Sequence, residues 1–296
     1  MIKESIGKIS DELYALGSPA LPAYLLLGKC PVLFDAGMTF MGPLYLRELK
    51  KYLGDANRLA YNFLTHSHYD HSGAAPFLKK NIPGLKVAAS NLAGEIFRRP
   101  NAVQLIQSLS KDMEEAYRPQ IGDADVTFRG LELDRTLEDG DEIDLKNGTQ
   151  IQVIATPGHT RDAVSYYIPL LKALVGGEAV GIFDRNFDVR PVFLSSYGDY
   201  LSSLEKLKKI EINLLMMGHF YVLTEGAQEM VTKAIEATKV FGRRIEEELY
   251  SLGGDQEAVV KKIFQEDYGE KKLIEQEERP FLINLKAQVK AVAERK

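Results

Sequence analysis

The chain has 296 residues, of which 45% are apolar and 27% charged, and its formal net charge is -5. This length and composition are ordinary for a globular protein with a large core, built as one large domain or as one domain with an appendage. The mildly acidic balance, with no basic cluster, argues against binding to nucleic acid or to a membrane surface.

Short apolar runs alternate with stretches of helical spacing over the first 220 residues. Several of the runs lie beside glycine or proline, which is typical of strands that end in turns. The predicted strands are 21–27, 32–34, 59–64, 86–89, 151–155, 163–168, 173–175 and 214–217. Helical spacing lies between the early strands at 44–53 and 74–80. The alternation predicts a layered α/β fold.

A longer helical pattern at 101–118 is inserted between two predicted strands. This helix either covers a site or only packs, and the sequence leaves both interpretations open. From about Glu225 the spacing is helical almost to the end, with breaks at Gly253 and Gly254. We therefore predict an α/β domain over residues 1–222 and an α-helical extension over 223–296.

The N-terminal stretch is polar, and the longest apolar runs, such as 21–28, are too short to span a bilayer. Cys30 is the single cysteine, so no internal disulfide can form. Its strand-like surroundings predict a small core residue. These features lead us to expect a cytoplasmic protein.

Three of the five histidines fall within six residues, in the order His-x-His-x-Asp-His. A predicted strand leads into this segment, and residues two apart on an extended backbone point the same way, so His66 and His68 can face one point. Asp70 and His71 then begin the next element. Imidazole nitrogens and carboxylate oxygens bind zinc at about 2.0–2.2 Å, so this cluster predicts a metal site.

Two more histidines follow predicted strands in a similar way. His159 lies in ATPGHT and His219 in LLMMGHF, each directly after a glycine. In α/β folds, a binding site is commonly built from residues at the ends of several strands, which meet at one edge of the sheet. Glu178, after another predicted strand and two glycines, is the candidate second carboxylate.

Two neighbours of the histidines are candidates for supporting roles. Tyr69, inside the motif, either lines a pocket or only packs. Asp162, three residues after His159, is a candidate hydrogen-bond partner for a ligand histidine.

At these residues the chain resembles the metallo-β-lactamase superfamily. The residues that match its signature motif and its later histidines, in the same order, are His66, His68, Asp70, His71, His159 and His219. The resemblance covers about residues 10–222. It implies an α/β fold, an αβ/βα four-layer sandwich with two metal ions in the cleft between its sheets, as the catalytic domain. In a thioesterase branch of the family, an α-helical C-terminal extension like the one predicted here is a cap over this cleft.

Carried over residue by residue, the resemblance implies two ligand sets. One metal would be held by His66, His68 and His159, and the other by Asp70, His71 and His219. The bridging carboxylate of the family is normally an aspartate, and the aligned residue here is Glu178. Glutamate reaches about 1–1.5 Å further, so it bridges, binds one metal only, or leaves the second site weaker. Zinc is the first choice for these ligands, with iron and manganese as alternatives.

The helical tail and the segment GEAVGIFD look most like a thioesterase branch that includes the quinolone-signal response protein and is related to glyoxalase II. In this chemistry a metal lowers the pKa of bound water from about 15.7 to about 7, and the resulting hydroxide attacks a carbonyl carbon. Asp70 is the predicted catalytic residue, because it can orient the nucleophile and accept its proton. We expect hydrolysis of a small-molecule ester, with a thioester preferred.

Two other functions stay open. Single-iron members of the superfamily oxidise persulfides with two histidines and an aspartate on iron, and a regulatory or partner-binding protein could retain the metal site. Cleavage of RNA, a further superfamily activity, is disfavoured by the acidic charge. The tail carries aromatic residues that are candidates for a pocket wall, for a homodimer face or for the core: Tyr250, Phe264, Tyr268 and Phe281.

Overall fold

A computed structural model describes residues 1–146 and 148–295. The chain divides into two compact units, which are described separately below. Unit 1 comprises Met1–Ala155, Asp162–Gly177 and Asn213–Glu225. Unit 2 comprises Thr156–Arg161, Glu178–Ile212 and Gly226–Lys296, so it contains two earlier segments besides the helical tail. The division at residue 222 stays a prediction.

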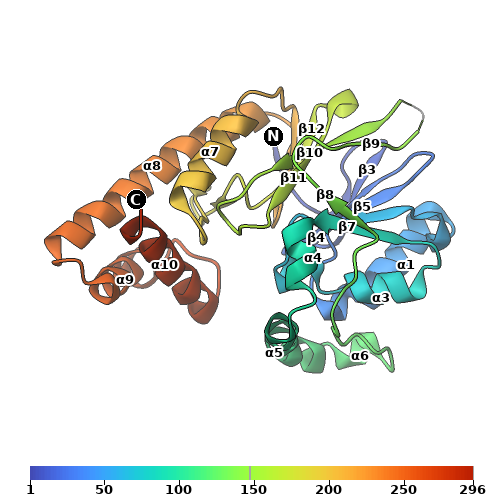
Figure 1. Ribbon diagram of the computed structural model, residues 1–296, viewed down its shortest axis with the longest axis horizontal. Coiled ribbons are helices and arrows are strands. Elements are labelled where there is room, and N and C mark those ends of the chain that lie inside the picture. Colours follow the sequence, from blue (N-terminus) through green and yellow to red (C-terminus); the bar gives the residue numbers. More distant parts are fainter. Residues whose placement is uncertain (147, 296) are drawn as a thin grey trace. The chain divides into compact units, whose positions relative to one another are not determined.

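Unit 1 contains two seven-stranded sheets (Figure 1). The first has the order β1-β16-β15-β12-β11-β10-β9 and is made of Ile2–Glu4, Tyr221–Leu223, Leu214–Met217, Ala173–Gly177, Val164–Ile168, Gln150–Ala155 and Glu142–Asp144. The second has the order β2-β3-β4-β5-β6-β7-β8 and is made of Gly7–Lys8, Leu13–Ser18, Leu21–Leu26, Val32–Phe34, Tyr61–Phe63, Lys86–Ser90 and Arg135–Leu137.

Both sheets mix parallel and antiparallel pairs. Strands β5, β6, β7 and β8 are parallel neighbours, as are β12 and β15. Parallel strands bring their carboxyl ends to the same edge of a sheet, which is where α/β folds place their ligands. The residues that follow β5 and those that follow β6 are therefore neighbours.

Two apolar cores hold unit 1 together. One lies between the sheets and includes the ring cluster of Phe34, Phe63 and Tyr166, with centroids 5.4–5.9 Å apart. The other packs helices against the second sheet, where Tyr45 and Leu49 of α1 are fully buried. The helices of unit 1 are η1 Thr39–Met41, α1 Gly42–Leu53, η2 Ala56–Arg58, α2 Tyr69–Ser72, α3 Ala75–Asn81, α4 Asn91–Ile96, α5 Pro100–Ala116, α6 Arg118–Ile121 and η3 Pro169–Leu171.

Unit 2 is mainly helical. A two-stranded hairpin, β13 Ile182–Phe183 and β14 Val189–Arg190, precedes its first helix. The helices are α7 Tyr197–Leu207, α8 Ala227–Ser251, α9 Gln256–Phe264, the π-helix η4 Gln265–Glu270 and α10 Glu278–Ala293. Rings of Phe264, Tyr268 and Phe281 stack on one another between α9, η4 and α10, with centroids 5.0–6.1 Å apart.

The predicted elements are confirmed, most of them within two residues at each end. All eight predicted strands are present, and the helical pattern at 101–118 forms α5. Ile106 and Ser110 of α5 are buried, so packing is at least part of its role. Cys30 is half-buried against the core between the sheets. Strands β1, β2, β3, β8, β9 and β16, the β13–β14 hairpin, and helices α4 and α7 were not predicted.

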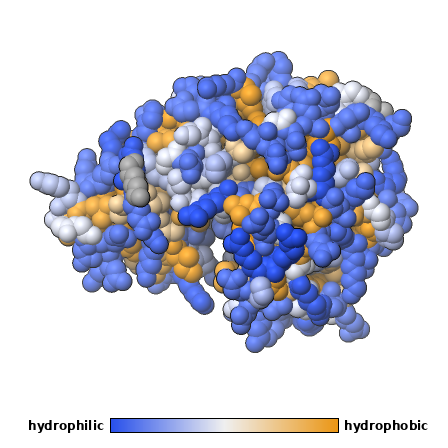
Figure 2. Space-filling model, viewed as in Figure 1, coloured by the Kyte–Doolittle hydropathy of each residue, from blue (hydrophilic) through white to orange (hydrophobic). Residues whose placement is uncertain are grey.

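Figure 2 shows that hydrophilic residues cover most of the visible face, with hydrophobic residues scattered among them. Within residues 1–146 and 148–295, every helix is too short or too polar to cross a lipid bilayer.

Candidate metal site

The signature motif lies on a turn between β6 and α3, where the chain leaves a buried strand and starts the short helix α2. His68 is extended (φ -63°, ψ 146°) and precedes α2, and the Ser72 hydroxyl donates to its carbonyl at 2.9 Å. The ring centroid of His66 lies 4.6 Å from that of His68 and 4.4 Å from that of His71. Unit 1 thus gathers the three motif histidines in one place.

His219 reaches the same place from the end of β15. Its Nε2 lies 3.3 Å from Nε2 of His71 and 3.7 Å from Oδ2 of Asp70. Two nitrogens bound to one tetrahedral zinc at about 2.0–2.1 Å are about 3.3–3.4 Å apart, so the spacing of the two imidazoles suits a shared ion. Donor atoms of His66 and His68 also lie within 4.8 Å of each other.

Three imidazoles of unit 1 have a polar partner at Nδ1. Nδ1 of His71 donates to Asp35 Oδ2 at 2.9 Å, and Nδ1 of His219 donates to Ala20 O at 2.6 Å. Nδ1 of His66 lies 3.0 Å from the Thr65 hydroxyl. A proton held on Nδ1 leaves the Nε2 lone pair for a metal, which is how outer partners orient ligand histidines.

Asp35 is a candidate site residue that the sequence analysis missed, since it contacts the ring of His71. It is 3% exposed and has a left-handed backbone (φ 59°), a conformation that aspartate tolerates better than most residues. Its carboxylate accepts from Thr65 N at 2.7 Å and from the Thr65 hydroxyl at 2.9 Å, besides the His71 contact. The available signal was an acidic residue directly after the predicted strand 32–34, followed closely by a glycine.

Unit 2 contains the other two predicted ligands, His159 and Glu178. Both are nearly buried, at 5% and 6% exposed, and Nε2 of His159 lies 3.8 Å from Glu178 Oε1. Nδ1 of His159 donates to Val192 O at 2.6 Å. The hydroxyl of Tyr200 donates to the Glu178 carbonyl at 2.9 Å. Unit 2 therefore pairs an oriented imidazole with a buried carboxylate whose own backbone carbonyl is held by Tyr200.

Gly158 explains how the loop before His159 packs so closely. Its φ is 134°, and a Cβ at this position would lie 2.4 Å from Tyr200 Cα, so a side chain here would clash with the backbone of α7. Its carbonyl accepts amide hydrogen bonds from Leu194, Ser195 and Ser196 at 3.0–3.2 Å.

The two predicted supporting residues lie in unit 1. Oδ2 of Asp162 accepts from Ser67 N at 2.7 Å, so this carboxylate holds the backbone between His66 and His68. Its contact with a ligand ring stays a prediction. Tyr69 is half-buried and packs against the apolar core beneath the second sheet.

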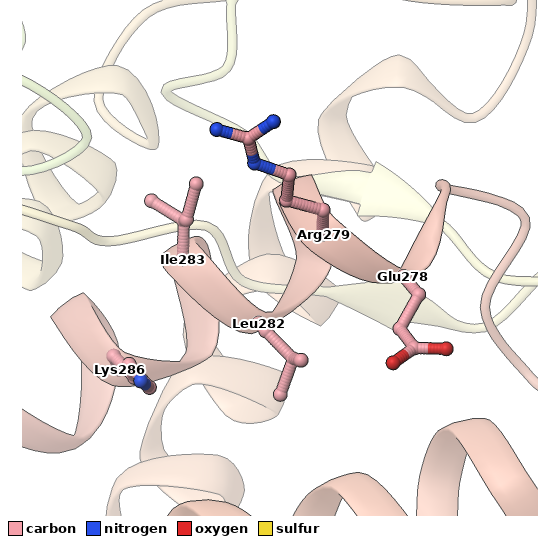
Figure 3. A pocket seen from close by; sticks show the side chains of 5 residues that line it. All are labelled: Glu278, Arg279, Leu282, Ile283 and Lys286. Atoms are coloured by element: carbon pink, nitrogen blue, oxygen red, sulfur yellow. The ribbon is translucent and has the colours of Figure 1, made fainter.

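Unit 2 also has a pocket that is lined by residues far along the chain from the predicted ligands. Figure 3 shows that its five lining residues all come from the start of α10: Glu278, Arg279, Leu282, Ile283 and Lys286. The lining combines anionic, cationic and apolar side chains and includes none of the predicted ligands.

The fold and the histidine cluster define a class of protein. A sequence profile described as the metallo-β-lactamase superfamily matches residues 22–219, about two thirds of the chain. The chain belongs to the metallo-β-lactamase superfamily. The predicted fold class, an α/β sandwich of this superfamily followed by C-terminal helices, is confirmed.

Individual relatives share little sequence identity with the chain outside one short local match. The chain is 25% identical over 209 residues to a beta-lactamase-like protein 2 homolog of Caenorhabditis elegans, covering 70% of this chain and 58% of that protein. A local match of 48 residues, 16% of this chain and 18% of the other, is 48% identical to a hydroxyacylglutathione hydrolase of Brucella anthropi. The crystal structure of BJP-1, a subclass B3 metallo-β-lactamase of Bradyrhizobium japonicum, is similar with a TM-score of 0.59 and 19% identity, covering 84% of this chain and 97% of that one.

Proposed function

We propose that this protein is a metal-dependent hydrolase that cleaves an ester, with a thioester preferred. One observation supports the proposal most strongly: Nε2 of His71 and Nε2 of His219 lie 3.3 Å apart, while the Nδ1 atom of each ring is held by an acceptor. Side chains held in this way are preorganised ligands. Without an ion, this arrangement would cost folding free energy, because it concentrates polar groups in a largely buried place. A bound cation would offset that cost.

We assign the ligands to two ions. His66, His68 and His159 would hold one, and Asp70, His71 and His219 the other, with Glu178 as the second carboxylate. The donor set consists of five imidazoles, four of which have a polar partner at Nδ1, and two carboxylates. This set suits zinc, with iron or manganese as alternatives. The number and identity of the ions are part of the proposal.

Chain connectivity supports the inclusion of His159 and Glu178. Glu178 directly follows Gly177, whose carbonyl accepts from the amide of Gly218, the residue before His219. His159 lies three residues before Asp162, which binds the backbone of the motif. Both ligands are thus tethered within a few residues of the unit 1 cluster.

The chain's own groups would divide the work of hydrolysis. A bound divalent ion would supply Lewis acidity, which polarises a carbonyl and makes water acidic enough to react near neutral pH. Asp70, half-buried and 3.7 Å from His219 Nε2, would orient the attacking water and accept its proton. Asp35 and Asp162 would hold the motif, and the histidines with it, in place.

Preference for a thioester rests on the relatives and on the tail. The local match to a hydroxyacylglutathione hydrolase supports it, as does the resemblance of the helical tail to the cap of thioesterases. A small-molecule substrate, a cytoplasmic location and a homodimer through the C-terminal helices remain predictions of the same hypothesis.

The test combines metal analysis with turnover. Purified protein should contain one or two zinc, iron or manganese ions per chain, and should hydrolyse members of a panel of small esters and thioesters. His68→Ala and Asp70→Asn should abolish turnover and leave the circular dichroism spectrum unchanged. Glu95→Gln, an acid-to-amide change on the exposed side of α4, is the matched control and should retain turnover.

Each contrary outcome points to a different function. Turnover that survives both His68→Ala and Asp70→Asn refutes the mechanism. Oxygen uptake with a persulfide, by protein that contains one iron, supports the dioxygenase alternative. Bound metal without turnover on any substrate supports a regulatory role.

A further inference from the structure

A short extended segment of unit 2, Arg190–Val192, links a predicted metal ligand to the C-terminal helices. We call it the Arg190–Val192 strap. On one side, Val192 O accepts the hydrogen bond from His159 Nδ1 at 2.6 Å. On the other side, Gln288 Nε2 of α10 donates to Pro191 O at 2.8 Å. The two contacts are made by adjacent peptide groups, so a shift of one carbonyl shifts the other.

The start of the strap is held by ion pairs around a buried carboxylate. Arg190 donates to Oδ2 of Asp267 at 3.1 Å, and Asp267, 1% exposed, also accepts from Arg244 of α8 at 2.9 and 3.1 Å. The guanidinium of Arg190 lies over the rings of Phe241 and Phe281, 5.7 and 6.0 Å from their centroids. Asp267 lies on the π-helix η4, an irregularity that is frequent where a helix places a side chain for a function.

The end of the strap is held by the loop that carries the ligand. Phe193 is fully buried, and the amides of the next three residues all donate to Gly158 O, the carbonyl directly before His159. The position of Val192 O relative to the His159 ring is therefore fixed from both ends. Gln288, at 5% exposed, has little room to release Pro191 in favour of water.

We propose that Gln288 and Asp267 are positioning residues for His159. They fix the strap and thereby Val192 O, which as a carbonyl can only accept and so keeps the imidazole proton on Nδ1. The lone pair of Nε2 then points away from the strap, available to a metal ion. The inference rests on the proposed function in taking His159 as a ligand. It makes the C-terminal helices a support of the metal site as well as a predicted cap.

Histidine tautomers in metal-free protein give a readout that needs neither metal nor substrate. With ¹⁵N-histidine labelling, and His159→Asn to assign the signal, the unchanged protein should show His159 as the Nδ1–H tautomer. Gln288→Met, similar in shape but without a donor, should give a mixture of the two tautomers. The matched control is Gln265→Met, whose amide contacts Glu270 on the exposed side of η4 and which should behave as the unchanged protein.

Zinc affinity, measured by competition with a chromophoric chelator, is the second readout. Outer partners of ligand histidines typically contribute about 10–100-fold. Because Gln288 acts through one peptide group, Gln288→Met should weaken zinc binding by about 10-fold, the lower end of that range. Asp267→Asn, which removes the charge that holds Arg190, should act in the same direction.

Two further comparisons keep the inference falsifiable. If circular dichroism shows that Gln288→Met fails to fold, Asp267→Asn decides the matter, and the reverse also holds. A folded variant of either kind with the tautomer and zinc affinity of the unchanged protein overturns the proposal. Unchanged protein that binds no zinc or shows no turnover counts against the proposed function, while the tautomer comparison in metal-free protein still decides the inference.

Discussion

Replacing Asp35 by asparagine tests how unit 1 holds its ligands. Thr65 N lies 2.7 Å from Oδ1 and can only donate, so the amide oxygen of the variant must take the Oδ1 position. The amide NH₂ then takes the Oδ2 position, 2.9 Å from His71 Nδ1. Two donors cannot share one hydrogen bond, so His71 would move its proton from Nδ1 to Nε2. Nε2 is the atom that we assign to the metal.

The expected loss of metal affinity depends on how well the hydrogen bond between Asp35 and His71 is shielded from water. Outer partners of ligand histidines contribute about 10–100-fold in metal affinity, which corresponds to about 1.4–2.8 kcal/mol at about 1.4 kcal/mol per tenfold. The His71 side chain is 2% exposed, so water cannot replace the lost acceptor. We therefore expect Asp35→Asn to lie in the upper half of this range.

Zinc competition with a chelator measures this loss of affinity. Glu48→Gln is the matched control, because Glu48 Oε2 accepts from the amide of Gly17 at 2.7 Å and so is another acid that holds backbone in unit 1. The reasoning is refuted if Asp35→Asn binds zinc within about twofold of the unchanged protein, less than about 0.5 kcal/mol, while remaining folded.

Three further predictions concern stability. The Ser110 hydroxyl is buried on α5 and has no hydrogen-bond partner among the residues that the structure describes. Ser110→Ala should therefore raise the free energy of unfolding, measured in urea, by about 1 kcal/mol. A lower free energy of unfolding would contradict this reasoning. Gly158→Ala would place Cβ 2.4 Å from Tyr200 Cα at a φ of 134°, and should destabilise the protein by about 1–3 kcal/mol or more in the same assay, unlike an alanine at open Gly198. Burial would raise the pKa of Asp267, but the hydrogen bond from Arg244 and the neighbouring positive charges outweigh it and hold that pKa below the ordinary 3.8. Its stabilising effect is therefore complete above the unfolded pKa of 3.8 and is lost as the pH falls through the lower folded pKa, and Asp267→Asn should flatten that part of a stability profile measured by urea unfolding.

The features that were predicted correctly depend on residues that lie close together in the sequence. The His-x-His-x-Asp-His spacing is a local pattern, and the structure places His66, His68 and His71 together. The strand at 32–34 and the strand at 214–217 were predicted to the residue, because apolar runs bounded by turn residues leave few alternatives. The helices of the tail were predicted for a similar reason, from their apolar spacing.

Several of the strands that were missed depend on pairing rather than on composition. Strand β1 forms only because Ile2–Glu4 finds β16, more than 200 residues later, and its own sequence has no apolar periodicity. The two-residue strands of the β13–β14 hairpin are too short to give a pattern. Their register comes from the partner strand, which a local pattern cannot specify.

By itself, the sequence determined which side chains can bind a metal and which strands lead to them. Only the tertiary structure decided how those side chains are held. Asp35 lies 36 residues before His71, and the partners of His219 and His159 are the backbone carbonyls of Ala20 and Val192. Every residue has a backbone carbonyl, so the side chains do not indicate which carbonyl a distant imidazole will contact. That contact is set only when the chain folds and separate segments come together.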